Sequence, residues 1–352
     1  MSDQKHTYFN ATILCQKTDP NSNDYLAQFE DTTAQNIVSR IGDYEFAIAR
    51  YSMEGANIPI FIPSISNGNI TTYTIQIAID IAGINYGSGE LSLIYTSPNS
   101  TVSSSDPSYY YIYNYDSFVS MVNAGFQQAL ANLKTNNPSV SFQTTAPILT
   151  YDGASNLFSI FCDAKSCISN TAGEQMTITF NNDLYTLLKT FNFQTIANNY
   201  RQLIVSNKIT NTASQNGIDY WVATQTAPST SNCWTPVQSI IFTSDSVSLK
   251  PEIIGNVSVV GNGLTLGANN SNNNQTMITD IVLDLTRSSD YFSEMISYVP
   301  SMYRWIDLSD GSNLRTFKFS VFWLNKFTQE RMPVLLSNNG CITLKVLFQK
   351  KQ

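Results

Sequence analysis

The C-terminal part of the chain alternates apolar and polar side chains with a period of two. This alternation is typical of β-strands that bury one face. Because two such strands nearly end the chain, we expect a sheet that is closed by its terminal strand, which favours a packing module over a catalytic scaffold. The apolar positions are Phe317, Phe319, Val321 and Trp323 in the first strand, and Ile342, Leu344, Val346 and Phe348 in the second.

Two further regions carry strand signals, and a region of mixed character separates them. Strands are expected at 44–51, 72–81 and 91–96 before this region, and at 237–243 and 277–285 after it. A Ser- and Pro-rich stretch opens the mixed region at residue 97. It continues with a helix from an Asp116 N-cap to Asn136, strands at 140–145, 148–151, 157–162 and 176–180, and a short helix at 182–189.

Antiparallel strands joined by long connections are typical of β-sandwiches and jelly rolls. We therefore expect an all-β fold, a single jelly-roll β-sandwich with a mixed α/β insertion between its two strand groups. Residues 44–96 and 234–352 are expected to form the discontinuous jelly-roll domain, and residues 97–233 the insertion. Residues 1–43 are expected to be an N-terminal arm with one short strand at 11–16.

Charged residues make up only 13% of the chain, and Asn, Ser and Thr fill most of the polar positions. A surface with so few charges can be buried against other proteins at a low desolvation cost. The net charge of −7 argues against a protein that binds nucleic acid on its own, because neutralising phosphates needs a basic surface.

The charge is unevenly distributed along the chain. Residues 301–352 contain eight Lys or Arg but only three acids, Asp307, Asp310 and Glu330, so this region is basic and the remainder is acidic. Two interpretations stay open. The basic side chains either line the solvent faces and edges of strands, or they contact an acidic partner or packaged nucleic acid.

Histidine- and cysteine-based chemistry has little support. The sole histidine, His6, lies in a polar segment, whereas Ser–His–Asp and Cys–His catalysis need a histidine fixed inside a pocket. The sparse cysteines indicate reduced thiols, with a Cys162–Cys167 disulfide as the less favoured alternative. We expect no catalytic residue, no metal and no cofactor. The cysteines are Cys15, Cys162, Cys167, Cys233 and Cys341.

The sequence also lacks the signals of membrane insertion. The first residues contain no apolar signal segment, and no run approaches the ~18 apolar residues that a membrane-spanning helix needs. We therefore expect a soluble chain without a membrane span.

Two short motifs match ligand-binding patterns incompletely. Asp19, Asn21, Asn23 and Glu30 have the spacing of a calcium loop, but an aspartate occupies the position where that loop needs glycine. Residues 261–267 are rich in glycine but lack the Lys-Ser/Thr pair of a phosphate-binding loop. A polar turn and an ordinary loop are the favoured interpretations.

Aromatic residues and carboxylates offer two further candidates. The run Tyr109–Tyr115 fits either strand core with exposed tyrosines or a patch at a protein interface. Paired carboxylates are the only enzyme chemistry that the composition leaves open, as in glycoside hydrolysis. Asp219 beside Tyr220 and Trp221 is a candidate for lining a sugar site, but nothing in the sequence fixes a second carboxylate.

Three segments of the chain resemble the minor capsid (penton) proteins of virophages and related polinton-like viruses. The resemblance spans the two strand groups, and none of its segments is a catalytic signature. The segments are Glu45–Ser52 with Asn57–Ile62, Trp234–Ser244 followed by Pro251-Glu252, and Tyr298–Leu308 running on to Val346–Lys351.

The resemblance implies a structural protein of the virion rather than an enzyme. It implies a single jelly roll that forms homopentamers at the vertices of an icosahedral capsid, surrounded by double-jelly-roll major capsid proteins and made in the host cytoplasm. On this interpretation, the basic region 301–352 is a candidate for non-specific contact with the packaged genome. The alternative is a carbohydrate- or receptor-binding β-sandwich of the fibre or adhesin kind.

Overall fold

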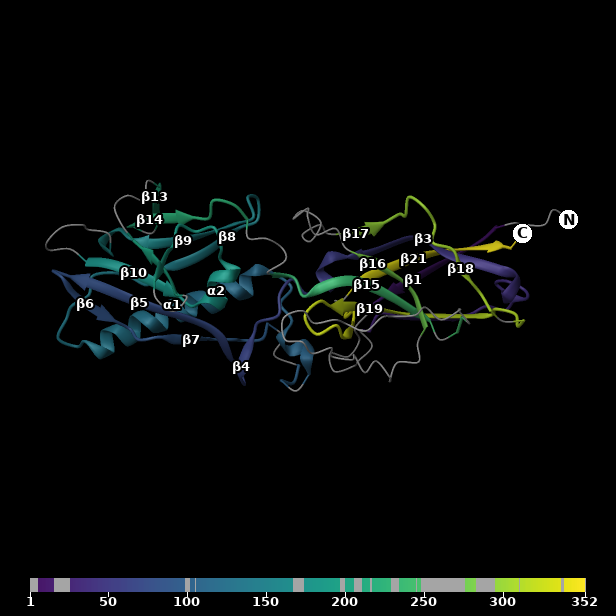
Figure 1. The fold of residues 1–352 in the computed structure, drawn as a ribbon, viewed down its shortest axis with the longest axis horizontal. Coiled ribbons are helices and arrows are strands. Elements are labelled where there is room, and N and C mark those ends of the chain that lie inside the picture. The colour runs from purple at the N-terminus through teal and green to yellow at the C-terminus, as the bar shows by residue number, and fades with distance from the viewer. Residues whose placement is uncertain are drawn as a thin grey trace. The chain divides into compact units, whose positions relative to one another are not determined.

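The computed structural model divides into two compact units, which we describe separately (Figure 1). The first unit comprises residues 1–59 and 236–352, and the second comprises residues 60–235. The residues that the structure describes are 6–15, 26–98, 102–104, 106–166, 174–196, 200–205, 211–215, 217–228, 234–244, 246–247, 276–282, 295–309, 311–336 and 339–351.

Two antiparallel sheets make up the first unit (Figure 1). The order in the first sheet is β1 (His6–Leu14), β21 (Cys341–Lys350), β3 (Tyr44–Glu54) and β17 (Met295–Tyr298), and β18 (Ile306–Asp307) also pairs with β3. The order in the second sheet is β16 (Thr276–Val282), β15 (Val237–Ser244), β19 (Thr316–Asn325) and β2 (Gln28–Thr32), and β20 (Arg331–Pro333) also pairs with β19. Two 3₁₀ helices flank β3, at Ile41–Asp43 and Gly55–Asn57.

The alternation at the C-terminal end produces the core of this unit, as expected. All eight apolar positions of β19 and β21 that define the pattern are buried. Aromatic rings join the sheets edge to face, with centroids 5.2 Å apart for Phe9 and Phe317 and 5.4 Å apart for Tyr51 and Phe242. The first and second sheets therefore pack face to face.

The second unit combines two sheets with two helices. The third sheet has the order β11 (Gln194–Ile196), β12 (Tyr200–Ile204), β10 (Glu174–Phe180), β5 (Ile70–Ile81) and β4 (Ile65–Asn67), and β6 (Ile84–Gly87) and β7 (Leu91–Ile94) also pair with β5. The fourth sheet has the order β13 (Asn211–Gln215), β14 (Ile218–Thr224), β9 (Leu157–Asp163) and β8 (Ile148–Asp152). The helices are α1 (Tyr115–Asn136) and α2 (Asn182–Leu187), with 3₁₀ turns at Pro107–Tyr110 and Ala164–Ser166.

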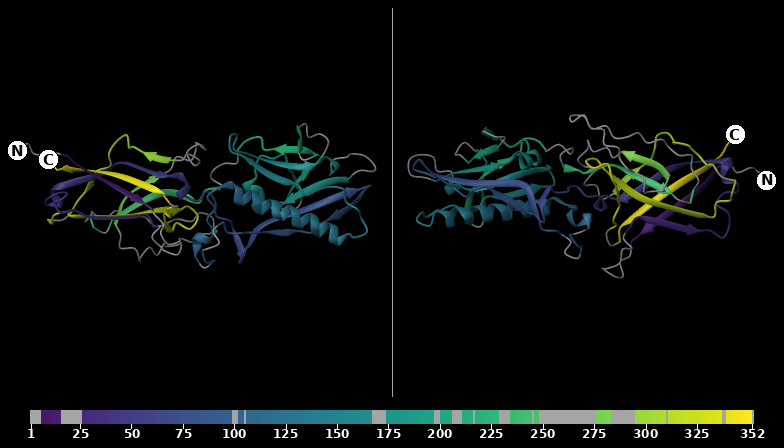
Figure 2. Two further views of the ribbon diagram at one scale, coloured as in Figure 1. Left: turned by 180° about the vertical axis from the view of Figure 1, so that it is seen from behind. Right: turned by 60° about the horizontal axis from the view of Figure 1, so that its bottom comes forward.

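Helix α1 lies lengthwise along strands β5 and β7 and also contacts β8 (Figure 2). Its buried face includes Phe118, Phe126 and Leu133. Gly125 allows the helix to approach the third sheet closely, because a Cβ there would collide with the Leu93 side chain. The expected N-cap, Asp116, is wrong. Asn114 caps the helix, and its side chain accepts a hydrogen bond from the Ser117 N–H over 3.2 Å.

One expected strand is absent. Residues 140–145 belong to no ladder, although the strands expected at 148–151, 157–162 and 176–180 are present as β8, β9 and β10. The apolar residue that suggested a strand, Phe142, is buried and packs edge to face against Tyr86 with centroids 5.8 Å apart. Phe142 and Thr144 are both buried, so the segment has the burial pattern of a strand without pairing to another strand.

The units differ from the expected domain boundaries of 1–43, 44–96 with 234–352, and 97–233. Strands β5, β6 and β7 lie in the second unit, because β5 pairs with β10 from Ile75↔Phe180 to Ile81↔Glu174. The expected N-terminal arm instead supplies β1 and β2 to the first unit. Apolar alternation marks a strand but does not reveal its partner.

An aromatic cluster around Trp234 joins the two ends of the second unit. Trp234 is 3% exposed, and its ring lies 5.1 Å from that of Phe61, 4.8 Å from Phe118 and 5.5 Å from Phe158. Phe61 and Trp234 are close to the first and last residues of the unit. Their contact therefore fixes the two chain ends beside helix α1.

Replacing Trp234 with alanine is expected to destabilise the second unit by about 3–5 kcal/mol, because a large buried ring is lost. Chemical denaturation followed by circular dichroism measures this change. Trp221 on β14 is the matched control, since it is only half-buried. Its replacement with alanine is expected to cost less than about 2 kcal/mol. Equal losses for the two variants would show that the cluster has no special role.

Candidate functional site

The residues with catalytic or metal-binding potential do not gather in one place. His6 is exposed on β1, Cys15 and Cys162 are buried, and Cys341 is half-buried. Within the described ranges, no group of three His, Cys, Asp or Glu side chains is arranged to hold a metal ion. Cys167, Cys233, the expected calcium-loop residues Asp19, Asn21 and Asn23, and the glycine-rich residues 261–267 lie outside the described residues.

The candidate sugar-binding residues lie on opposite faces of β14. Asp219 is exposed and Tyr220 is 7% exposed, as expected for neighbours on a strand whose side chains alternate between two faces. Trp221 is half-buried and shares the face of Asp219. The structure therefore does not bring Tyr220 together with Asp219 as a binding platform.

The tyrosine run packs within its own unit. The Tyr95 ring lies 5.7 Å from Tyr109 and 5.5 Å from Tyr110, and the Tyr95 hydroxyl donates a hydrogen bond to the Tyr109 carbonyl over 2.6 Å. The Tyr110 hydroxyl donates to the Gly68 carbonyl over 3.1 Å. Tyr109 and Tyr110 are half-buried in the 3₁₀ turn Pro107–Tyr110, so the expected strand core is wrong for them, and the interface patch stays a prediction.

Burial keeps several tyrosine hydroxyls neutral. It raises the pKa of Tyr73, Tyr95 and Tyr151 from 10.0 to about 12. Burial, followed by the nearby Tyr298, also raises the pKa of Tyr51. Burial likewise raises the pKa of the Cys341 thiol, with Glu54 adding to the shift. These shifts move the groups away from neutral pH, whereas nucleophiles are usually activated by a lowered pKa.

The raised tyrosine pKa values predict a loss of stability in alkaline solution. Below pH 10 the three hydroxyls are protonated in both states. Between pH 10 and about 12 the unfolded chain releases protons that the folded chain retains, so the free energy of unfolding falls as pH rises. Denaturation at a series of pH values, with tyrosinate absorbance recorded in parallel, measures this slope. Tyr73→Phe is expected to reduce it, and a constant free energy through pH 12 would contradict the assignment.

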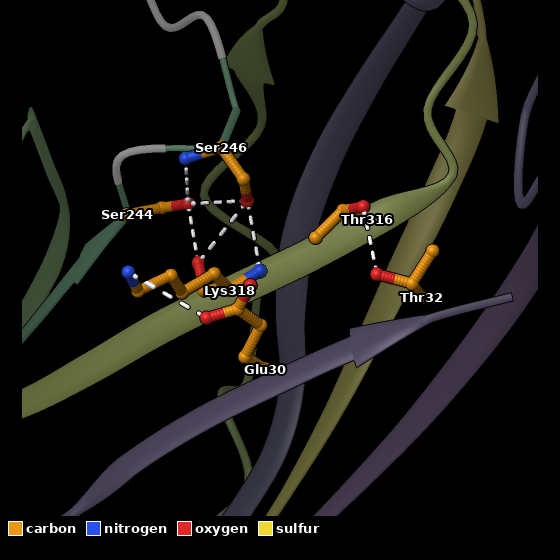
Figure 3. Close-up of polar contacts among 6 residues, drawn as sticks. All are labelled: Glu30, Thr32, Ser244, Ser246, Thr316 and Lys318. Carbon is orange, nitrogen blue, oxygen red and sulfur yellow. Dashed lines mark hydrogen bonds and ion pairs between the residues drawn. The ribbon is translucent and has the colours of Figure 1, made fainter.

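A polar cluster ties three strands of the second sheet together (Figure 3). The Ser244 hydroxyl donates to the Lys318 carbonyl over 2.6 Å, and the Lys318 N–H donates to the Ser246 hydroxyl over 2.8 Å. The Lys318 ammonium lies 3.6 Å from the Glu30 carboxylate on β2. All of these groups have partners within the cluster, so it is a structural element of the sheet.

A small cavity of about 240 Å³ adjoins this cluster and is lined by Ile41, Ser246, Asn313, Arg315 and Thr316 among others. Sites for small molecules usually enclose about 300–1,000 Å³ of mainly apolar space. The Nε–H of Arg315 donates to the Asn36 side chain over 2.8 Å. The cavity is therefore smaller than most small-molecule sites, and one of the donors of Arg315 is used within the unit.

Much of the positive charge in residues 301–352 has partners within the first unit. Lys351 lies 3.3 Å from the Asp307 carboxylate and donates to the carbonyls of Gly42 and Leu308 over 3.1 and 3.2 Å. Arg304 pairs with Asp280 over 3.4 Å, and Lys318 pairs with Glu30. Arg304, Lys318 and Lys351 thus form ion pairs within the first unit, while Lys350 is exposed. The contact with an acidic partner or packaged nucleic acid stays a prediction.

Strand β17 and its connection to β18 carry several exposed apolar side chains. Val299 and Met302 are 67% and 85% exposed, and Met295, Tyr298 and Tyr303 are also exposed. Exposed apolar side chains that are close together in sequence are candidates for protein contact. Strand periodicity did not single out this segment, although residues 295–303 contain no charged residue. That uncharged run was the available signal.

The helices in the described part of the chain are too short or too polar for a bilayer crossing.

Comparison with known proteins identifies relatives across nearly the whole chain. The family model for Sputnik minor capsid protein V18/19 matches residues 7–350. An uncharacterised protein V18 of Sputnik virophage is 30% identical over 119 residues, which are 29% of this chain and 70% of that protein.

Two solved structures have similar folds. A chain in the cryo-EM structure of Sputnik virophage has a TM-score of 0.68 at 22% identity, over 98% of both chains. The crystal structure of a selenomethionine-labelled mavirus penton protein has a TM-score of 0.63 at 15% identity, over 99% of this chain and 100% of that one. Since the family model spans almost all of the sequence, the chain belongs to the Sputnik minor capsid protein V18/19 family of virophage capsid proteins.

Proposed function

We propose that this capsid protein forms homopentameric vertices of an icosahedral virion and acts by packing rather than catalysis. The observation that carries the proposal is the strand pairing of the first unit. Eight of its strands pair in a nested order along the chain, the outermost two with each other and so on inward. The pairs are β1 with β21, β2 with β19, β3 with β17, and β15 with β16. This pairing supports a single jelly roll.

In this proposal, the second unit is an insertion between the third and fourth strands of the jelly roll. Residues 60–235 leave the first unit after β3 and return before β15. The insertion is mixed in character, because it contains α1 and α2 as well as two sheets. The proposed insertion is therefore residues 60–235 instead of the expected residues 97–233.

Contacts with other capsid proteins follow from the same proposal. A vertex protein must meet both its own copies and the surrounding major capsid proteins, which the family resemblance implies are double jelly rolls. The low charge density and the exposed apolar segment 295–303 support such contacts, because both reduce the cost of removing water from an interface. Synthesis in the host cytoplasm and location in the virion belong to the proposal as well.

The mass of the purified protein in solution tests the proposal. Analytical ultracentrifugation is expected to give an assembly of five 39.2 kDa chains, and negative-stain images are expected to show five-fold rings. A stable trimer that binds a glycan array would contradict the vertex role and favour a fibre- or adhesin-like protein.

Placing a charge in the apolar segment 295–303 is expected to impair assembly. Val299→Glu combined with Met302→Glu requires a carboxylate to be desolvated at a capsid contact, so incorporation into particles is expected to fall at least about tenfold. Phe327→Glu is the matched control, since Phe327 is 67% exposed but lies outside the segment. Quantitative blotting of purified particles measures incorporation. Equal incorporation of all three proteins would exclude this segment from the contact.

We also propose that exposed bases of residues 301–352 contact the packaged genome without sequence preference. Lys350→Glu is expected to lower the genome content of particles and leave the stability of the protein unchanged. Lys351→Glu is expected to destabilise the first unit by about 1–3 kcal/mol, because it removes hydrogen bonds to two carbonyls. The amount of nuclease-protected nucleic acid and thermal denaturation separate the two effects. Normal genome content in the Lys350→Glu particles would exclude the contact.

A further inference from the structure

Two cations stand directly opposite each other on the outward face of the first sheet. Arg50 on β3 is the register partner of Lys345 on β21. Their neighbours Tyr51 and Leu344 are buried in the core, so Arg50 and Lys345 point away from it. The next outward pair, Ser52 and Thr343, confirms this orientation, because their hydroxyls lie 2.6 Å apart across the same two strands.

Like charges directly opposite each other on neighbouring strands destabilise a sheet. The Lys345 ammonium lies 4.7 Å from the centre of the Tyr8 ring, which compensates part of its charge. Across the ranges that the structure describes, no carboxylate forms an ion pair with Arg50 or Lys345. Arg50 is exposed. The face therefore presents two cations beside two hydroxyl groups and keeps a repulsion that a bound anion would relieve.

A complementary acidic feature lies at the edge of the second sheet. Strand β2 ends that sheet and carries Glu30 and Asp31, which are both exposed. Glu30 is partly compensated by Lys318 (Figure 3). Asp31 has no ion-pair or hydrogen-bond partner in the described part of the chain. One unit thus carries both an uncompensated cationic pair and an uncompensated carboxylate.

The positions of these two features, on a face and on an edge of the sandwich, suit a closed ring of few subunits. In a ring of five, each subunit uses two different surfaces, and the outward directions of these surfaces enclose an angle of about 108°. The face and the edge of a β-sandwich lie at roughly 90° to each other, whereas its two opposite edges or faces lie at about 180°. A contact from face to edge therefore closes a small ring more readily than a contact between opposite edges.

We propose that the Arg50–Lys345 pair of one copy receives the β2 edge of the next copy, with the uncompensated Asp31 as the main charged partner and Glu30 on the opposite face of the same edge strand as the second. This contact rests on the proposed homopentamer and names the surfaces that build it. A guanidinium can bind a carboxylate through two parallel hydrogen bonds, so Arg50 orients the incoming strand while Lys345 adds charge. The contact also neutralises the cross-strand repulsion within the first sheet.

A charge-swap experiment on the full-length protein tests the contact. The concentration at which half of the wild-type pentamer dissociates is measured by analytical ultracentrifugation at low and high salt. Arg50→Glu with Lys345→Glu is expected to raise this concentration at least about tenfold, as is Glu30→Lys with Asp31→Lys. The protein that carries all four substitutions is expected to recover most of the loss, because the opposite charges meet again. High salt is expected to weaken the wild-type pentamer.

Matched controls separate this contact from general charge effects. Lys326→Glu with Lys350→Glu makes the same change in net charge elsewhere in the first unit and is expected to leave the pentamer intact. Arg50→Gln with Lys345→Gln tests the loss of charge without reversal, and circular dichroism verifies that each variant is folded. A wild-type protein that is not pentameric would overturn the vertex role, and with it the contact.

A pentameric wild type whose folded double-reversal variants stay equally pentameric would overturn the contact alone. If the protein with all four substitutions does not regain the pentamer stability that the double variants lose, the contact is also overturned. A variant of Arg50 and Lys345 that keeps the pentamer but retains less DNA would instead assign this face to the genome, and the contact would again be overturned.

Discussion

The first unit depends on the aromatic packing between its two sheets. The ring centroid of Phe317 on β19 lies 5.2 Å from that of Phe9 on β1 and 6.4 Å from that of Phe348 on β21. One ring therefore packs against two strands of the facing sheet. Phe317 and Phe348 are fully buried. Rings packed edge to face contribute energy beyond the area that they bury. These contacts set the spacing of the two sheets. The positions of the outward faces and edges therefore depend on this aromatic core.

The sequence predicted the strands of this core well, because burial of one face leaves a period of two through most of β19 and β21. It predicted their grouping less well. Strand β5 alternates more regularly than β3, but its partner is β10 and not a strand of the first unit. Hydrogen bonds between strands are formed by backbone groups that every residue carries, so a single sequence contains little information about pairing.

Two local sequence signals were wrong, namely the apolar alternation around Phe142 and the N-cap at Asp116. Phe142 reaches the core from a segment without a ladder, and Asn114 rather than Asp116 lies where a side chain can accept the Ser117 N–H. The candidate site was harder to predict still. The basic excess of residues 301–352 is real in composition, but Lys351 and Lys318 are paired with carboxylates that only the folded chain brings near. Conversely, Arg50 lies far from that region in sequence and becomes the neighbour of Lys345.

The position of β21 has a consequence for how the protein is made. It lies between β1 and β3, the first and third strands of the proposed jelly roll, although more than 280 residues of sequence separate it from β3. The residues of β21 must therefore have left the ribosome before the first sheet can form, because the pairing joins segments that are far apart in the sequence. A chain that stops short of β21 would keep β1 and β3 apart, with their edges open. Synthesis of β21 thus decides when the first sheet becomes able to fold and enter an assembly.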